Sequence, residues 1–502
     1  MGSDEKNPAA APHPPQPPIR DPPYADYLYD IYRARLLANQ LSVATTDPYA
    51  LEGEARRVMS SEVKPNEDGE GATIPPRPAA FGYIAGGAGA GTTVEANRRA
   101  LDSVALVPRM MRPGKARPDT DAATASLRDL RVRLFGGPGH GPPVDLASPV
   151  VMAPVGVQCA YHPDREVGVA GACAEVGVPF SISTASSSSF EEIKVSLDDT
   201  SVEDNAGTPS PAPWYQLYWP QDDAITASLL QRARAAGSRV LLVTVDTFTI
   251  AWRPTDLDAG YLPFITTNEG NAIGFSDPVF RKKLAEGQPG DEADEEDEKS
   301  EPVTPENNVL AASLAWTSEV FPRRARPWSD LATLRRLWGD DGAILIKGIQ
   351  HPDDALLARQ YGADGVVVSN HGGRQVDGAV ASLEMLPEVV AAVRAAEARD
   401  AGEAERNGTS SQQPAPFTIL FDSGIRTGSD VIKALCLGAQ AVLVGRPVMY
   451  GLGIAGRDGA KHVLQGLLAD LDQTMNLIGC MSISDLGPHM LRKGGAAFKA
   501  SL

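Results

Sequence analysis

The chain has 502 residues, a formal net charge of −18, 42% hydrophobic residues and 22% charged residues. This composition is ordinary for a soluble globular protein with a large core, and the acidic balance argues against a nucleic-acid partner, which needs a basic surface. No window approaches eighteen uninterrupted apolar residues, so the sequence predicts no transmembrane helix and no membrane partner. Because the N-terminus also lacks the basic-then-apolar order of a secretory signal, we expect a cytoplasmic protein.

The N-terminal part of the chain divides into two segments. Residues 1–24 are rich in proline with little to bury and predict a disordered tail. Residues 25–148 are interpreted as a helical segment that contributes to the active site. Within it, "GGAGAG" (86–91) resembles a dinucleotide-binding loop, but it lacks the third glycine in register and no strand precedes it. We therefore expect a turn between two helices there.

Eight short apolar runs follow between residues 149 and 488, and each has the pattern of a buried parallel strand. Helical stretches that close on glycine precede most of them, as in "LLQRARAAGSRVLL" and "IKALCLGAQAVLV". Eight strands alternating with helices predict an α/β fold with a closed (β/α)8 TIM barrel, and an open doubly wound sheet is the alternative. The runs are "PVVMAP" at 149, "PFSIST" at 179, "PWYQLY" at 213, "RVLLVTVD" at 239, "AILIKG" at 343, "DGVVVSN" at 364, "FTILFDSG" at 417 and "AQAVLVGR" at 439.

The connection after the fourth run is the exception to this regular spacing. Roughly a hundred residues separate Asp246 from Ala343, several times the usual length, which predicts a long lid insertion over the site. It contains an acidic segment, about residues 285–308, that we expect to be a disordered surface loop. A second surface insertion is expected at about residues 397–416, and residues 489–502 are interpreted as a C-terminal tail.

Polar residues gather where the strands are expected to end, and the active site of such barrels lies at that end. Their number exceeds what strand ends need for stability. Gly424, Arg426, Gly445 and Arg446 follow the last two runs, where barrels commonly bind phosphate, while Asp422 suits a ribityl or ribose hydroxyl. The other residues delivered there are Gln216, Tyr218, Thr244, Asp246, Lys347, Ser369, His371 and Arg374.

Four cysteines, Cys159, Cys173, Cys436 and Cys480, lie far apart and form no C-x-x-C pair. They predict reduced, buried thiols and no metal site.

The motifs "SNHGGRQVDG", "DSGIRTGSD", "LVGRP", "LVTVDT" and "YQLY" together resemble the FMN-dependent L-2-hydroxy acid oxidase/dehydrogenase family from about Phe81 to about Pro488. "APVGVQ", "STASSSS" and "AWRPTDLDAGYLPF" are most similar to its lactate 2-monooxygenase branch. The resemblance implies FMN as cofactor and a small 2-hydroxy acid as substrate, with L-lactate the first choice. It also implies a homo-tetramer or homo-octamer.

The same resemblance implies a role for each matching residue. His371 would be the catalytic base, Asp246 would orient it, and Tyr218 would lie near the substrate hydroxyl. Tyr83, Arg253 and Arg374 would bind the substrate carboxylate. Positive charge from Lys347 would lie near flavin N1 and O2. The remaining implied cofactor contacts are Ala153, Pro154, Val155, Ser183, Gln216, Thr244, Ser369, Asp422, Gly424, Arg426, Gly445 and Arg446.

The chain also departs from its relatives. Ala185 stands where glycolate oxidase carries tryptophan, which alters the expected substrate pocket, and the chain has no haem-binding domain. Oxygen is therefore the expected electron acceptor. The motifs leave open whether the product is released with hydrogen peroxide or oxidatively decarboxylated, and whether a carbanion or a hydride leaves C2. Two alternatives stay open: another FMN- or phosphate-binding barrel, and a catalytically silent binding module.

Overall fold

The computed structural model describes residues 24–61, 77–112, 128–136, 141–203, 211–265, 269–287, 302–407, 416–494 and 496–497. The predicted proline-rich tail, apart from Tyr24, lies outside these residues. So do residues 288–301 of the predicted acidic loop and residues 408–415 of the predicted surface insertion.

Eight parallel strands form one sheet in the order β4-β11-β10-β9-β8-β7-β6-β5. The two outer strands of this order, β4 and β5, approach each other, and the Met152 N–H donates to the Pro179 carbonyl just before β5 at 3.0 Å. The sheet is thus a nearly closed barrel, which confirms the predicted (β/α)8 fold over the open sheet. The strands are β4 (Val150–Met152), β5 (Ser181–Ser183), β6 (Trp214–Leu217), β7 (Val240–Thr244), β8 (Ala343–Ile349), β9 (Gly365–Val368), β10 (Thr418–Phe421) and β11 (Ala441–Val444).

The amino ends of the strands are sealed by apolar packing. Val240, Leu242 and Leu345 form one buried cluster with Leu134 and Phe135, which belong to or follow a small antiparallel hairpin. This hairpin consists of β2 (Val132–Leu134) and β3 (Val144–Leu146). Because it fills one end of the barrel, only the carboxyl ends of the strands remain available for chemistry.

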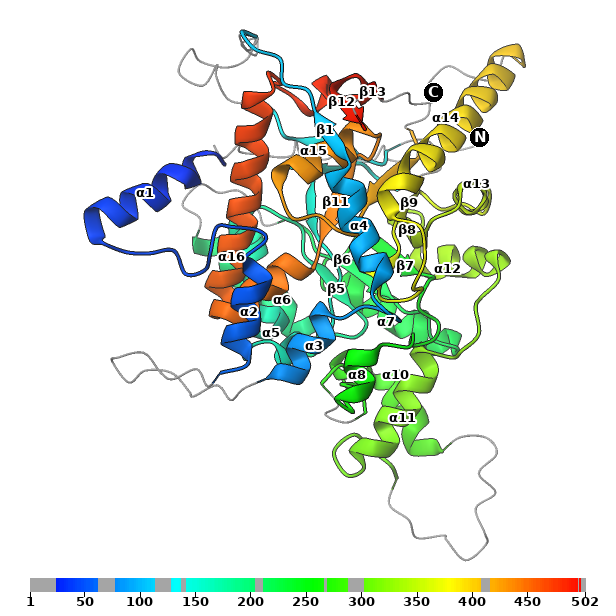
Figure 1. Ribbon diagram of the computed structural model, residues 1–502. Coiled ribbons are helices and arrows are strands. Elements are labelled where there is room, and N and C mark those ends of the chain that lie inside the picture. Colours follow the sequence, from blue (N-terminus) through cyan, green and yellow to red (C-terminus); the bar gives the residue numbers. More distant parts are fainter. Residues whose placement is uncertain are drawn as a thin grey trace, which may run out of the picture.

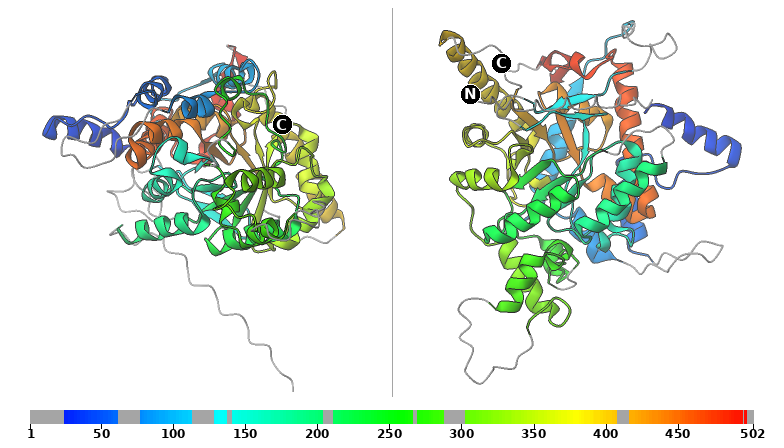
Figure 2. Two further views of the ribbon diagram at one scale, coloured as in Figure 1. Left: turned by 90° about the horizontal axis from the view of Figure 1, so that it is seen from below. Right: turned by 180° about the vertical axis from the view of Figure 1, so that it is seen from behind.

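Helices surround the sheet, as the two views of Figure 2 show. Local signals explain their ends: Asp222 caps α7 through the amides of Ala224 and Ile225, and Thr427 and Asp430 form a capping box on α15. The helices of the barrel are α5 (Arg165–Val176), α6 (Phe190–Glu203), α7 (Asp223–Ala235), α12 (Leu331–Trp338), α13 (Pro352–Gln360), α14 (Ser382–Arg406), α15 (Gly428–Cys436) and α16 (Arg446–Leu477). Residues 397–406, where a surface insertion is predicted, form the last turns of α14.

The N-terminal segment packs across the barrel and meets the C-terminus. Its elements are α1 (Asp26–Ala38), α2 (Leu51–Met59), α3 (Pro78–Ala85), α4 (Thr92–Asp102) and β1 (Val104–Leu106). Helix α1 has no buried residue and extends away from the body in Figure 1. Strand β1 pairs antiparallel with β12 (Leu491–Lys493), which pairs with β13 (Ala496–Ala497), so part of the predicted C-terminal tail is sheet.

The "GGAGAG" segment joins α3 to α4, which confirms the predicted turn. Helix α4 has no capping side chain of its own. Asp377, which follows β9 in the chain, accepts hydrogen bonds from the Ala90 amide at 2.7 Å and the Thr92 hydroxyl at 2.6 Å. The glycine-rich turn is therefore held against the loop that carries the conspicuous "SNHGGRQVDG" motif.

The long connection between β7 and β8 is itself helical. It contains α8 (Pro254–Asp258), α9 (Ala272–Phe275), α10 (Pro278–Glu286) and α11 (Val309–Val320) before α12. Helices α10 and α11 project from the end of the molecule where α3 and α8 lie (Figure 1). That this connection moves as a lid stays a prediction. In the part of the chain that the structure describes, no helix is long and apolar enough to cross a membrane.

Candidate active site

A pocket opens at the carboxyl ends of the barrel strands and contains about 1010 Å³ of space not filled by protein atoms. Most of the residues predicted from the motifs reach it, although the first and last of them, Tyr83 and Arg446, are 363 residues apart in the chain. Predicted residues that line it are Tyr83, Ala153, Pro154, Val155, Tyr218, Arg253, Lys347, His371, Arg374, Asp422, Gly424, Arg426, Gly445 and Arg446, together with Ala185.

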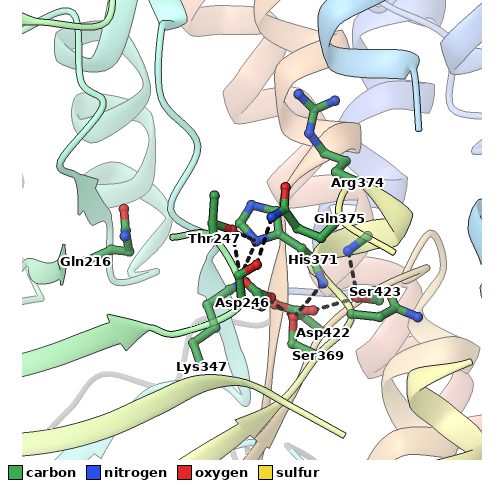
Figure 3. Close-up of polar contacts among 12 residues, drawn as sticks. Gln216, Asp246, Thr247, Lys347, Ser369, His371, Arg374, Gln375, Asp422 and Ser423 are labelled. Carbon is green, nitrogen blue, oxygen red and sulfur yellow. Dashed lines mark hydrogen bonds and ion pairs between the residues drawn. The ribbon is translucent and has the colours of Figure 1, made fainter. Parts of the chain in front are cut away.

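His371 of the pocket wall is hydrogen-bonded to Asp246. His371 Nδ1 lies 2.8 Å from Asp246 Oδ1, and the Thr247 hydroxyl donates to the same carboxylate oxygen at 2.8 Å. Figure 3 shows the three side chains meeting between β7 and β9. Gly348 makes room for this pair, because a Cβ at that position would lie 2.7 Å from Asp246 Cβ. With Nδ1 held by the carboxylate, Nε2 of the imidazole is the nitrogen available to a ligand.

Charge and burial act on this pair in opposite directions. Burial lowers the pKa of His371, as does nearby Lys347, while Asp246 raises it, and the net pKa lies below the ordinary 6.5. For Asp246, burial raises the pKa, but His371 and Lys347 outweigh it and hold the pKa at about 2. The imidazole is therefore neutral and the carboxylate ionised near neutral pH. This is the state in which an imidazole can accept a proton and a carboxylate can stabilise the resulting cation.

The backbone at His371 is unusual. His371, Gly372 and Gly373 have φ values of 58°, 65° and 76°, in the left-handed region that non-glycine residues rarely adopt. Hydrogen bonds fix the turn: the His371 amide donates to Ser369 Oγ at 3.0 Å and the Gly372 amide to Ser423 Oγ at 3.0 Å. The turn places both His371 and Arg374 on the pocket wall.

Tyr83, Arg253 and Arg374 lie at one end of the pocket. The Arg374 guanidinium stacks over the Tyr83 ring, 4.8 Å from its centroid, and donates to the carbonyls of Tyr83 and Gly86. Arg253 donates through Nε to the Arg374 carbonyl at 2.9 Å. Burial, and then the charge of Arg374, lower the pKa of Arg253. Two cations and a phenol at one end of a partly buried pocket suit an anion such as a carboxylate.

Gln375 connects this cationic end to the His371 pair. Its side-chain oxygen accepts from Arg253 at 2.8 Å, and its side-chain nitrogen donates to the Asp246 carbonyl at 2.7 Å. It thereby fixes the spacing between the cationic end and the imidazole. Tyr218 lies on the same wall and packs against Phe321, with ring centroids 5.1 Å apart. Burial raises its pKa, so its phenol stays neutral and can donate a hydrogen bond.

Lys347 occupies the floor of the pocket. Its Nζ lies 3.3 Å from Asp422 Oδ2 and 3.3 Å from Ser369 Oγ. Burial lowers its pKa, but Asp422 and Asp246 outweigh that effect, and the net pKa is raised. A buried cation results, close to carboxylates that follow β7 and β10.

Ser183, Gln216 and Thr244 are buried and do not line this pocket, and Thr244 lines a second pocket that shares Thr247 with it. Ser183 Oγ donates to the Gln216 side-chain oxygen at 2.9 Å. Gln216 Nε2 and Thr244 Oγ1 have no hydrogen-bond partner among the described residues. Buried polar atoms nearly always have a hydrogen-bond partner, so these two atoms indicate a bound ligand with polar atoms at the inner wall of the barrel. The polar edge of a flavin ring meets that requirement.

The predicted phosphate-binding residues are assembled at another part of the wall. Gly424 adopts φ 103°, and both Arg426 and Arg446 line the pocket. Arg446, however, donates to three backbone carbonyls, those of Ile84, Gly86 and Gly372, at 2.8 to 2.9 Å. Burial lowers its pKa to about 10. Among the described residues, the Arg426 guanidinium donates a single hydrogen bond, to the neighbouring Ile425 carbonyl. Arg426 is thus the freer cation, and phosphate binding by Arg446 stays a prediction.

The residues present fit FMN, and comparisons with known proteins agree. Residues 73–493 match the model of the FMN-dependent dehydrogenase family, so the chain belongs to that family and uses FMN. It is 43% identical to the FMN-dependent alpha-hydroxy acid dehydrogenase qulF of Penicillium citrinum over 477 residues, 95% of this chain and 97% of that protein. It is 34% identical to an L-lactate oxidase of Nostoc, covering 82% of this chain and 93% of that one.

Solved structures agree with the fold as well. A mandelate oxidase crystallised with (S)-4-hydroxymandelic acid aligns with a TM-score of 0.63 and 31% identity, covering 90% of this chain and all of that one. The protein is therefore an enzyme that oxidises an alpha-hydroxy acid with FMN.

Several pocket residues carried no signal strong enough to be singled out in the sequence. Thr247 follows Asp246 directly and Gln375 follows Arg374 directly, so both belong to the quoted motifs and could have been found. Phe264 ends the quoted "AWRPTDLDAGYLPF" motif and Ile250 directly precedes it, so these two could have been found as well. Tyr161 and Phe321 lie outside the quoted motifs, and the three-dimensional fold alone brings them to the pocket.

Proposed function

We propose that this enzyme oxidises a small L-2-hydroxy acid, with L-lactate as the first candidate, to the 2-oxo acid and that oxygen accepts the electrons. The observation that carries the proposal is one pocket holding the neutral His371 imidazole, paired with Asp246, beside the cationic end formed by Arg374, Arg253 and Tyr83. A base beside a carboxylate-binding end, in one pocket, suits a molecule whose hydroxyl and carboxylate are carried by adjacent carbons.

His371 is the proposed catalytic base. Oxidation of a 2-hydroxy acid removes two electrons and two protons, so a group at the substrate must accept a proton. The imidazole accepts it at Nε2, and the Asp246 carboxylate on Nδ1 stabilises the resulting cation. Asp246 is thus proposed to orient the His371 imidazole and to stabilise its protonated form. Tyr218 is proposed to donate a hydrogen bond near the substrate hydroxyl.

Substrate orientation is assigned to the cationic end. Arg374 has donors left after binding the Tyr83 and Gly86 carbonyls through one terminal nitrogen, and a guanidinium grips a carboxylate with two parallel hydrogen bonds. Arg253 adds charge, and Tyr83 adds a phenol. Together they fix which bond of the substrate faces the imidazole.

When bound, FMN supplies the two-electron acceptor. The proposed holding residues are Ala153, Pro154, Val155, Ser183, Gln216, Thr244 and Ser369 at the ring side. Asp422, Gly424, Arg426, Gly445 and Arg446 are proposed for the ribityl and phosphate side. The buried Lys347 cation sits where it can stabilise negative charge that develops in the pocket.

The substrate side chain faces an apolar wall formed by Ala185, Ile250, Phe264 and Phe321. Ala185 leaves space where a tryptophan would fill it, so an aromatic acid such as (S)-mandelate is a second candidate. The family resemblance supports two outcomes for lactate: release of pyruvate with hydrogen peroxide, or oxidative decarboxylation of retained pyruvate to acetate, carbon dioxide and water.

The deciding experiment mixes the FMN-loaded protein with L-lactate or (S)-mandelate, first without oxygen and then in air. We expect the flavin absorbance to bleach anaerobically and to recover on aeration. Acetate formed in air indicates a monooxygenase, whereas pyruvate plus peroxide indicates an oxidase. If no 2-hydroxy acid bleaches the flavin, the proposed function is wrong.

A further inference from the structure

The phenol of Tyr161 is a buried polar group that the proposed mechanism does not use. Tyr161 follows the short 3-10 helix Gln158–Ala160 in the loop between β4 and α5, and its side chain lines the active-site pocket. The residue is 0% exposed, and its hydroxyl has no hydrogen-bond partner among the described residues.

Three other buried or half-buried tyrosines have satisfied hydroxyls. Tyr215 Oη lies 3.1 Å from Thr184 Oγ1, Tyr261 donates to Glu269 at 2.7 Å, and Tyr450 donates to Glu52 at 3.0 Å. Leaving a hydroxyl unsatisfied in a protein interior costs free energy, so proteins normally avoid it. An unsatisfied phenol that also lines a ligand pocket points to a partner on the ligand.

The surroundings indicate which part of the ligand this is. Burial raises the pKa of Tyr161 well above its ordinary value, and the groups acting on it next are Tyr83, which raises it, and Arg374, which lowers it. The hydroxyl therefore stays protonated as a donor, at the end of the pocket where Arg374 stacks over Tyr83.

A buried carboxylate that also acts on Tyr161, that of Glu166, already has its hydrogen-bond partners. Glu166 is fully buried and accepts from the amides of Gln158 and Ser187 and from the hydroxyls of Ser187 and Ser188, at 2.5 to 3.1 Å. Four donors account for its lone pairs, so it has no acceptor left for Tyr161.

We propose that Tyr161 Oη donates a hydrogen bond to the carboxylate of the substrate, as a third donor beside Tyr83 and Arg374. The proposal rests on the proposed function and makes it more specific. A carboxylate can accept from all three donors, whereas an amide presents a donor NH2 on one side. The site therefore selects free 2-hydroxy acids over their amides.

The test compares Tyr161→Phe with Tyr261→Phe in the FMN-loaded protein. Tyr261 is the matched control because its ring packs edge-on against Tyr83 at 5.8 Å while its hydroxyl already has a partner. The probe is oxalate, a carboxylate with no C–H bond to oxidise, titrated through the flavin absorbance. We expect Y161F to raise the oxalate dissociation constant about tenfold or more, as for loss of a hydrogen bond to a charged group, and Y261F to change it less than threefold.

Thermal unfolding supplies the second readout. Removing an unsatisfied hydroxyl should leave the melting temperature of Y161F equal to or above that of the wild type. The proposal is overturned if oxalate binds Y161F as tightly as wild type, if Y261F weakens binding equally, or if Y161F melts clearly lower, which would reveal a protein partner for the phenol.

The same titration separates this proposal from the proposed function. Oxalate binding that weakens in Y161F, with no flavin reduction by any 2-hydroxy acid, would reject the reaction and keep Tyr161 as a carboxylate donor. If the wild-type protein does not bind oxalate but a 2-hydroxy acid reduces its flavin, the proposed role of Tyr161 is rejected and the proposed reaction is kept.

Discussion

Opposing influences set the pKa of the His371 imidazole. Burial and Lys347 favour the neutral ring, and Asp246 favours the cation. The neutral form prevails near neutral pH, yet the partner that stabilises the protonated form lies 2.8 Å away. An imidazole in this position can accept a proton, and the neighbouring carboxylate lowers the free-energy cost of the charge that forms.

This balance predicts the acid side of the pH profile. A base must be unprotonated to act, so kcat/KM falls as the pH drops through its pKa. Because that pKa lies below 6.5, we expect the acid limb below pH 6.5 in wild type. Asp246→Asn removes a negative charge that raises the pKa of His371, so the acid limb of the kcat/KM profile should move to lower pH. The same change should lower kcat by about 10²-fold or more. Measuring kcat/KM for L-lactate as a function of pH checks this prediction. An acid limb above pH 6.5 would mean that a residue other than His371 is the base.

Replacing the base itself separates chemistry from cofactor binding. His371→Ala should keep its FMN, because the loop is tied by the backbone amides of His371 and Gly372, but anaerobic reduction by substrate should slow by about 10²–10⁴-fold. Stopped-flow absorbance measures the rate, and dithionite, which needs no base, should reduce both proteins alike. Near-normal reduction by substrate would remove His371 as the base.

At the scale of residues, the sequence predicted which side chains reach the pocket better than it predicted the hydrogen bonds that they make. Strand-end position and motif were enough to bring His371, Arg374 and Lys347 to one pocket. The three carbonyl contacts of Arg446 could not be predicted, because they depend on the exact approach of α3 to the "HGG" turn. Tyr161 was missed because a single tyrosine in a loop forms no sequence pattern. It attracts attention only in the structure, where its buried hydroxyl has no hydrogen-bond partner among the described residues.

At the scale of elements, close helix packing explains one glycine that begins α15. A Cβ on Gly428 would lie 2.2 Å from the Leu471 amide nitrogen and 2.5 Å from the Asp470 carbonyl carbon on α16. Because the obstacle is backbone, it cannot rotate away. The same residue follows Arg426 and Thr427, so this contact also sets the position of the predicted phosphate loop.

Gly428→Ala should therefore lower the free energy of unfolding by about 1–3 kcal/mol and weaken FMN binding. Gly466→Ala is the matched control, since it lies within α16 with nothing within 4 Å of its Cβ position, and alanine there should be neutral or stabilise by up to about 1 kcal/mol. Thermal unfolding and FMN titration of both variants test the contrast. Equal melting temperatures would show that α15 can shift away from α16 without cost.

The sequence predicted all eight barrel strands because each is a short apolar run and most of them follow a helical stretch that closes on glycine. It did not predict β1, β12 or the β2–β3 hairpin. Strands β2, β3 and β12 read Val-Arg-Leu, Val-Asp-Leu and Leu-Arg-Lys, so charged residues interrupt them and they form no apolar run. Val104 of β1 pairs with Lys493, which lies 389 residues further along the chain. Such pairings are decided by tertiary packing and not by local sequence.

At the scale of the whole molecule, the β1–β12 pairing ties the N-terminal segment to the end of the barrel domain. Met490 and Leu491 are 4% and 0% exposed, so the C-terminal strand also contributes to the core. The segment that carries Tyr83 is thereby held at two places after that residue: by α4 against the "HGG" turn and by β1 against β12.

A chain ended after Gly487 should lose about 3–6 kcal/mol of stability, because two fully buried apolar side chains and the strand pairing are removed. A chain ended after Ala497 keeps both strands and serves as the control. Chemical denaturation of the two proteins, monitored by tryptophan fluorescence, checks the difference. Indistinguishable midpoints would mean that β12 is not part of the cooperative unit.

The left-handed backbone at His371 has a consequence for how this enzyme can change. Histidine in that conformation stores strain, of the order of 1–3 kcal/mol, that glycine would largely avoid. Selection for heat resistance alone would therefore favour replacing the residue that the reaction needs most. A library sorted only by folding should lose histidine at position 371, while one sorted by turnover should keep it and accumulate stabilising changes elsewhere.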